Sequence, residues 1–292
     1  MTRILLLLVF VLQPATALVP ERLAPGVIST SAIETDGTFL PDGQTLFFSR
    51  RAGQWGEEMQ YSAIFVSRMT PKGWGSPVIA DFSGEWSDDD VFAAPDGRAV
   101  VFVSQRPTPD GADHDRDIWM TAATGDGWGE ATHLPAPVSS PALDIGPSIA
   151  ANGTLYFASD RPGGHGSGDL YRARLVDGGY PEVENLGPVV NGPSGEWNVL
   201  VAPDESFLIF ESSGREGGLG PGGDLYLSYR TGGAWGTPIH LDAISTPGSD
   251  LMARISPDGS RLYYSTTFTA DGTDADIVSV PLAALLARYP RP

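Results

Sequence analysis

The chain has 292 residues, of which 41% are hydrophobic and 18% charged, so its composition is that of a folded protein with a full-sized core. It carries 36 acidic residues against 18 lysines and arginines, and this net charge of −18 argues against nucleic acid or an anionic lipid surface as a partner. Glycine and proline, at 36 and 25 residues, predict many short strands joined by turns.

The N-terminal residues have the pattern of an export signal. Arg3 gives a positive start, and residues 4–12 form an apolar run that is far shorter than the roughly 20 residues that span a bilayer. Ala15-Thr16-Ala17 has the small-x-small form of a signal-peptidase site, so we predict cleavage after Ala17 and a periplasmic or secreted protein. The chain has no cysteine, so neither a disulfide framework nor a lipid-modified cysteine is expected.

A turn motif, Pro-Asp-Gly or a close variant, recurs along the rest of the chain. It begins at residues 41, 95, 151, 203 and 257, at intervals of 54, 56, 52 and 54 residues. Proline presets φ for a tight turn and glycine accepts a positive φ, and a β-rich run such as Leu46-Phe47-Phe48 follows. The sequence therefore contains five copies of one unit.

Each unit is interpreted as four strands. The third strand opens on an aspartate in the later copies: Asp117, Asp169, Asp224 and Asp276. The fourth strand follows an aromatic residue: Trp74, Trp128, Tyr180 and Trp235. Four antiparallel strands at a fixed period are typical of a β-propeller. The fifth copy ends before its fourth strand, so an N-terminal strand within residues 21–30 is predicted to complete the last blade and close the ring.

We therefore predict one all-β domain over residues 18–292, a five-bladed β-propeller of four-stranded antiparallel blades. The repeats occupy about residues 31–84, 85–140, 141–192, 193–246 and 247–292. Residues 282–287 have the composition of a short helix after the last strand.

The repeated string resembles a known family. An acid seven residues before Pro-Asp-Gly, then aromatic-x-Ser, then Asp-Ile/Leu-aromatic is similar to the TolB-like propeller repeats, bacterial relatives of the WD repeat. Residues 159–164 and 168–171, Ser-Asp-Arg-Pro-Gly-Gly and Gly-Asp-Leu-Tyr, carry the resemblance most plainly. It covers all five repeats and implies a non-catalytic adaptor that binds a protein, peptide or cell-envelope component. The family also includes gating propellers of peptidases, but this chain has no Gly-x-Ser-x-Gly elbow.

One position is acidic in every copy, seven residues before the turn proline. These residues, the acid column, are Glu34, Asp88, Asp144, Glu196 and Asp250. They open the innermost strands, so they are expected to ring the channel mouth on the face opposite the Pro-Asp-Gly turns. They are either structural carboxylates that tie adjacent blades through backbone N–H groups, or a funnel that binds a cation or a cationic ligand. The same face completes a candidate ligand-binding set with Trp86, Trp197, Arg106, Arg161 and Arg215.

The alternative function is a glycoside hydrolase, because five-bladed propellers also house enzymes that cleave sugars with inner-strand carboxylates. The candidate catalytic residues would be Glu34, Asp88, Asp144 and Glu196. An enzyme places different acids at unequal depths, whereas this column is acidic in all five blades at one register. The symmetry therefore favours a structural or ion-binding role.

A calcium site is the one weak option for a cofactor. Asp113, Asp115 and Asp117 place oxygens at alternate positions, but Ile118 and Thr124 stand where a calcium loop needs glycine and glutamate. No metal or other cofactor is therefore expected. We expect a monomer without a transmembrane segment that binds a protein or envelope component.

Overall fold

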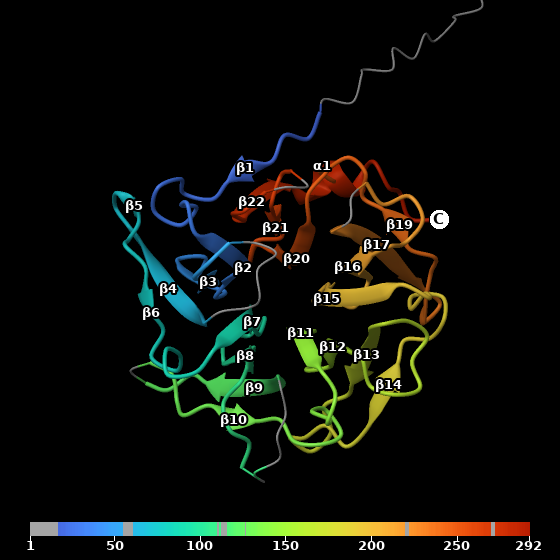
Figure 1. Ribbon diagram of the computed structural model, residues 1–292, viewed down its shortest axis with the longest axis horizontal. Coiled ribbons are helices and arrows are strands. Elements are labelled where there is room, and N and C mark those ends of the chain that lie inside the picture. Colours follow the sequence, from blue (N-terminus) through green and yellow to red (C-terminus); the bar gives the residue numbers. More distant parts are fainter. Residues whose placement is uncertain are drawn as a thin grey trace, which may run out of the picture.

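The computed structural model describes residues 17–54, 61–109, 111, 116–125, 127–219, 222–269 and 272–292. Residues 1–16 of the predicted export signal lie outside these ranges, as do the weak metal candidates Asp113 and Asp115. The described residues form five antiparallel sheets around a common centre (Figure 1). The predicted fold, an all-β five-bladed propeller, is confirmed.

The strands of each blade run outward from the centre, in chain order except for the closing strand of blade 5. Blade 1 contains β2 (Ile33–Phe39), β3 (Thr45–Arg51), β4 (Ser62–Thr70), β5 (Gly73–Trp74) and β6 (Val78–Ile79). Blade 2 contains β7 (Asp88–Ala93), β8 (Ala99–Ser104), β9 (Asp117–Ala122) and β10 (Thr132–His133). Blade 3 contains β11 (Asp144–Ile149), β12 (Leu155–Ser159), β13 (Asp169–Ala173) and β14 (Val183–Asn185).

Blade 4 contains β15 (Gly195–Val201), β16 (Phe207–Ser213), β17 (Gly223–Thr231), β18 (Ala234–Trp235) and β19 (Ile239–His240). Blade 5 contains β20 (Asp250–Ile255), β21 (Arg261–Thr266), β22 (Asp276–Pro281) and β1 (Glu21–Arg22). The short helix α1 (Leu282–Leu286) follows β22. No helix in the described ranges is long and apolar enough to cross a membrane.

The N-terminal strand closes the ring. β1 pairs with β22, with Glu21 opposite Ser279, and the Leu23 N–H donates to the Ile277 carbonyl at 2.8 Å. The Leu23 side chain is buried in one apolar cluster with Ile277 and residues of blade 1. Residues near the two ends of the chain therefore share one sheet, with β1 pairing along the outer edge of β22.

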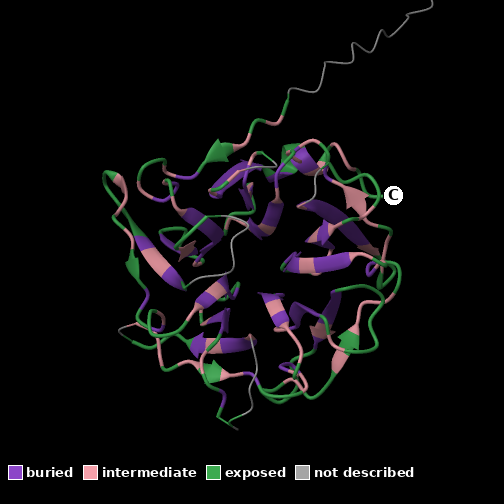
Figure 2. Cartoon of the chain, viewed as in Figure 1, coloured by how far each residue is buried: buried purple, intermediate pink, exposed green. Residues whose placement is uncertain are grey.

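The inner strands position the rest of the molecule. The five inner strands contact one another in a ring: β2, β7, β11, β15 and β20. Figure 2 shows them mostly buried, while the outer strands are more exposed.

Each inner strand ends in a Pro-Asp-Gly-type turn. In the first, the Asp42 carboxylate accepts the N–H groups of Gln44 and Thr45, and Gly43 has a φ of +64°. The sequence motif is thus a self-capped turn on one face of the disc.

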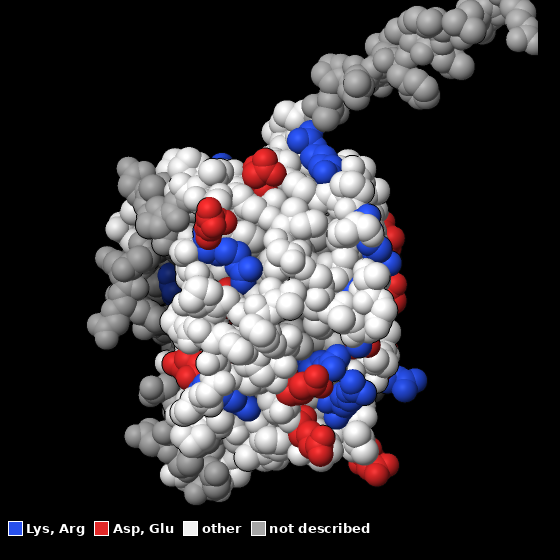
Figure 3. All heavy atoms as spheres, turned by 90° about the vertical axis from the view of Figure 1, so that its right-hand side faces the viewer, with Lys and Arg blue, Asp and Glu red and all other residues white. Residues whose placement is uncertain are grey.

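The net negative charge is not gathered in one patch on the side of the propeller shown in Figure 3, where acidic and basic side chains lie beside one another. Blades 3 and 4 carry such pairs: Arg172 lies 2.8 Å from Glu184, and Arg230 lies 2.9 Å from Glu205. The Arg172–Glu184 pair is exposed and therefore contributes little to stability.

Ring closure is testable with Leu23→Ala. Loss of a buried leucine should lower the free energy of unfolding by about 2–5 kcal/mol in urea titrations. Val19→Ala is the matched control, since Val19 is 71% exposed. If both variants unfold at the wild-type midpoint, the N-terminal strand does not hold the ring closed.

Candidate functional site

The acid-column side chains are all fully buried, with 0% of each residue exposed. In blades 1 to 4 an arginine from the end of the second strand pairs with the acid. The pairs are Arg50–Glu34 at 2.9 Å, Arg106–Asp88 at 2.8 Å, Arg161–Asp144 at 2.6 Å and Arg215–Glu196 at 2.7 Å. The structure thus joins three predicted arginines to predicted acids. Arg50 escaped sequence analysis because it stands two residues after its aromatic position, where the others stand four or five.

Each column acid also fixes the link that arrives from the preceding blade. In four blades it accepts the N–H of the residue four positions earlier: Thr30 at 3.0 Å, Ser140 at 2.6 Å, Gly192 at 2.9 Å and Thr246 at 2.6 Å. In blade 2 the Ser83 hydroxyl donates to Asp88 at 2.7 Å instead. These are the bonds that the structural interpretation expects. A funnel open to ligands does not describe these carboxylates, because the protein itself encloses them.

Blade 5 departs from this pattern. Phe268 stands at the place of the arginine, eighteen residues after Asp250, and the Arg22 guanidinium lies 4.8 Å from its ring. Burial without a guanidinium partner raises the pKa of Asp250 to about 6.

A second column lies two residues after the acid, where every inner strand contains a β-bulge and its residue has a left-handed φ. The residues of this bulge column are Asp36 (63°), Asp90 (51°), Gly146 (59°), Asn198 (47°) and Met252 (57°). Glycine, asparagine and aspartate tolerate this conformation, whereas methionine is strained in it. The recurrence of Asp, Asp, Gly and Asn at one register is the sequence signal that could have revealed the bulges.

The bulge residues bond one blade to the next. The Asp36 carboxylate accepts the Asp90 N–H at 3.2 Å, and the Asp90 carboxylate accepts the Gly146 N–H at 3.0 Å. Gly146 has no room for a side chain, because a Cβ there would lie 2.6 Å from the Asn198 Cα. The bulges therefore set the close approach of the inner strands around the channel.

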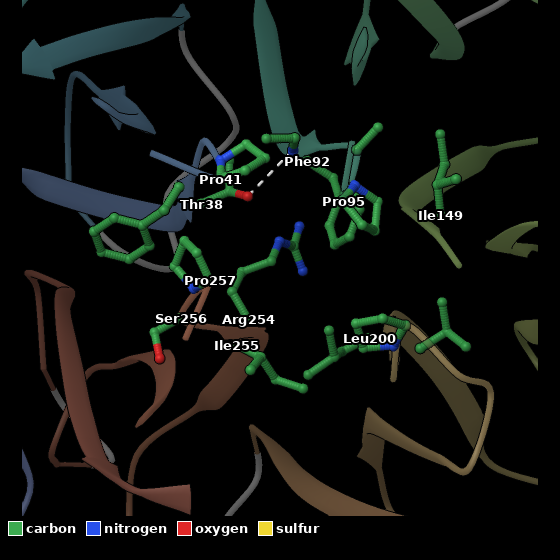
Figure 4. A pocket seen from close by; sticks show the side chains of 15 residues that line it. Thr38, Pro41, Phe92, Pro95, Ile149, Leu200, Arg254, Ile255, Ser256 and Pro257 are labelled. Carbon is green, nitrogen blue, oxygen red and sulfur yellow. Dashed lines mark hydrogen bonds between the residues drawn. The ribbon is translucent and has the colours of Figure 1, made fainter. Parts of the chain in front are cut away.

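Arg254 divides the channel into two ends. From β20 its Nη2 lies 3.3 Å from Asp36 Oδ1 and 3.2 Å from the Val91 carbonyl oxygen, so it reaches from blade 5 to blades 1 and 2. Figure 4 shows its guanidinium in the middle of the cavity on the Pro-Asp-Gly side. That cavity has a volume of about 120 Å³ and mainly apolar walls. The turn prolines that line it are Pro41, Pro95, Pro203 and Pro257.

Towards the acid column, the channel holds polar side chains that we call the channel cluster. Its members are Asp36, Asp89, Asp90, Arg116, Asn198, Glu211 and Arg254. Arg116 pairs with Asp89, and Asn198 Nδ2 donates to Glu211 at 2.7 Å. Asp89, Arg116 and Glu211 are partly exposed, so these three groups are within reach of a ligand.

Burial gives this cluster unusual protonation. It raises the pKa of Asp36 to about 8, that of Glu211 to about 7 and that of Asp89 to about 6. Neighbouring carboxylates, Asp90 above all, raise these pKa values further, while Arg116 opposes the rise at Asp89. At neutral pH the cluster can therefore both donate and accept hydrogen bonds through carboxyl groups.

The two predicted tryptophans have different surroundings. Trp197 packs between blades 3 and 4, because a Cβ at Gly168 or Gly195 would lie 2.3 or 2.5 Å from its indole. Trp86 is 38% exposed.

The remaining metal candidate, Asp117, is hydrogen-bonded to His133 at 2.8 Å. Within the described ranges, no group of three or more His, Cys, Asp or Glu side chains is arranged to hold a metal ion.

Comparison with known proteins supports the fold. No known family profile matches the chain, and no curated protein matches it in sequence. A putative TolB from Agrobacterium tumefaciens is 18% identical, with a TM-score of 0.52 over 83% of this chain and 72% of its own. The α-L-arabinofuranosidase from Lactobacillus brevis is 11% identical, with a TM-score of 0.56 over 86% of this chain and 90% of its own.

TolB from Acinetobacter baumannii is 12% identical, with a TM-score of 0.48 over 86% of this chain. The match covers 54% of that protein, so this chain spans about half its length. The two likenesses with TM-scores above 0.5 show a shared propeller fold and, at such identities, nothing about activity.

Asp250 makes stability depend on pH. Its folded-state pKa of about 6 lies above the ordinary 3.8, so the folded protein holds the proton more tightly than the unfolded chain. This stabilisation is fully present below about pH 4 and is lost as the pH rises through about 6. Between pH 4 and 7, Asp250→Asn should remove about 2.4 kcal/mol of the fall in unfolding free energy. Urea titrations at four pH values check this, and equal pH dependence in variant and wild type would refute it.

Proposed function

We propose that the protein is an exported, non-catalytic propeller that binds a protein, peptide or envelope component at the acid-column mouth of its channel. The observation that carries this proposal is that the five blades share the acid column but differ in the residues of the bulge column. The acid column has a carboxylate in every blade, as expected of residues that stabilise the fold. The bulge column has four different residue types in five blades. The bulge residues Asp36, Asp90 and Asn198 are themselves buried. Because the repeat does not fix this position, the channel lining beside it differs from blade to blade, and there Asp89, Arg116 and Glu211 are partly exposed.

The accessible part of the channel cluster indicates the chemistry of that ligand. Asp89 and Glu211 offer carboxyl groups and Arg116 offers a guanidinium, within one mouth. Adjacent groups of both signs favour a polar segment of mixed charge, which they would orient through hydrogen bonds. The apolar cavity beyond Arg254 opens on the opposite face, so the two mouths suit different ligands.

The export pattern in the sequence and the propeller fold shared with TolB proteins are consistent with this role. The fold alone does not distinguish it from catalysis, because the arabinofuranosidase shares the same fold. The distinction therefore rests on the side chains of the channel.

A capture experiment tests the proposal. Tagged wild-type protein is used to isolate partners from gently solubilised envelopes of its own host, beside Glu211→Gln and Asp89→Asn. One stoichiometric partner is expected, retained about tenfold or more weakly by both variants, because each removes a partly buried charge from the mouth. Glu182→Gln is the control for the same chemical change at an exposed glutamate, and it should bind like wild type.

Ile255→Trp tests the choice of face, since Ile255 lines the apolar cavity of the opposite mouth. The proposal expects this variant to keep the partner. If Ile255→Trp alone loses it, binding occurs on the Pro-Asp-Gly face. If the wild-type protein captures nothing, the binding function is refuted.

One observation favours a glycoside hydrolase as a second candidate. Glu211 is partly exposed and its pKa is raised to about 7, as a general acid at neutral pH requires. The enclosed column acids are poorer candidates, because arginine and backbone groups occupy four of them. Hydrolysis of aryl glycosides that is lost in Glu211→Gln and kept in Glu182→Gln would establish this alternative.

A further inference from the structure

A second cavity lies on the outer side of blade 2, apart from the channel. It has a volume of about 720 Å³. It is lined by residues 81–83, 85 and 86, which lead into blade 2, and by residues 128–133, which include β10. Four aromatic side chains line it: Phe82, Trp86, Trp119 and Trp128. None of the channel cluster lines it, so its function is independent of the function proposed above.

Three of the four rings are held by packing. The Phe82 ring lies 6.1 Å from the Trp128 ring, edge to face, and the Arg106 guanidinium lies 5.1 Å from the Trp119 ring. Trp86 differs, because it is 38% exposed and makes no ring or cation contact with any described residue. Trp119 is 5% exposed and its face already carries the Arg106 guanidinium, so Trp128 and the exposed Trp86 are the indoles left for a ligand.

The charges around the cavity are unbalanced. Three exposed carboxylates line it, those of Asp81, Glu85 and Glu130, and none forms an ion pair or a side-chain hydrogen bond with a described residue. Its two basic residues, Arg106 and His133, are each already bonded to a buried aspartate. The free charge at the cavity is therefore negative, which attracts a cation.

We propose that this cavity binds a quaternary ammonium group, such as that of choline. Aromatic faces attract a cation through their π electrons, most strongly for indole, and its methyl groups pack on the rings. A quaternary ammonium has no N–H group to satisfy, so packing on the rings together with nearby negative charge is enough to hold it. The carboxylates of Glu85 and Glu130 supply the countercharge.

The test compares choline with 3,3-dimethyl-1-butanol, a neutral molecule of the same shape, by calorimetry and tryptophan fluorescence on the intact protein. Choline should bind about tenfold or more tightly than the alcohol, and Trp86→Ala should weaken choline by a similar factor. The double variant Glu85→Gln/Glu130→Gln should also weaken choline, and added salt should weaken it in the wild type. Because the replaced side chains are exposed, unfolding midpoints should stay at the wild-type value.

Two controls separate this site from the channel. Glu182→Gln and Glu211→Gln should bind choline like the wild type, so a failure of the channel proposal leaves this result unaffected. Phosphocholine and phosphatidylcholine vesicles identify the source of the group: sedimentation of the protein with vesicles indicates a lipid headgroup, and binding of choline alone indicates a free metabolite. The proposal is overturned if the alcohol binds as tightly as choline, if a neutral saccharide displaces choline at lower concentration, or if choline shows no binding at roughly 10 mM.

Discussion

The buried carboxylate at the start of each inner strand is the constraint on which the propeller depends. A carboxylate with no exposed surface has to be satisfied by the protein, and here one oxygen typically holds an arginine while the other holds the link from the preceding blade. In blade 3 this joins the end of β12, the start of β11 and the loop before it around Asp144. One side chain per repeat thereby fixes the geometry between successive blades.

The β-bulge two residues after the carboxylate differs from it, because its residue type is not the same in every blade. It turns one residue of each inner strand into a left-handed conformation, and the residue at that place changes from blade to blade. Asp36 and Asp90 use it to bond neighbouring strands, while Arg254 crosses from blade 5 and separates the polar end of the channel from the apolar end. The acid column and the bulge column are two residues apart in each inner strand. A rigid ring therefore supports a channel whose side chains differ from blade to blade.

The fold was predictable because it repeats. Turn prolines at a near-constant spacing, an aspartate at the start of the third strand and a missing final strand are local signals, and each predicted a feature that the structure contains. Sequence analysis placed Arg161 and Asp144 on one face, but their ion pair was not predicted, because a shared face does not specify which side chains meet. Arg50 was missed because its spacing from the aromatic residue differs from that of the other three arginines. The crossing by Arg254 depends on contacts with residues 218 and 163 positions away, which no local pattern reveals. Trp86 and Trp197 look alike in sequence, and only the glycines beside Trp197 distinguish a packed indole from a free one.

The most direct test of this account compares two glutamates of blade 4, Glu196 of the acid column and Glu211 of the channel cluster. Unfolding free energies of Glu196→Gln and Glu211→Gln are measured in urea at pH 7. Glu196→Gln breaks a buried ion pair and should lose about 3–5 kcal/mol, whereas Glu211→Gln neutralises a carboxyl whose pKa is already about 7 and should lose less than about 1 kcal/mol. Equal losses, or a larger loss at Glu211, would contradict the division between a structural acid column and a functional channel cluster.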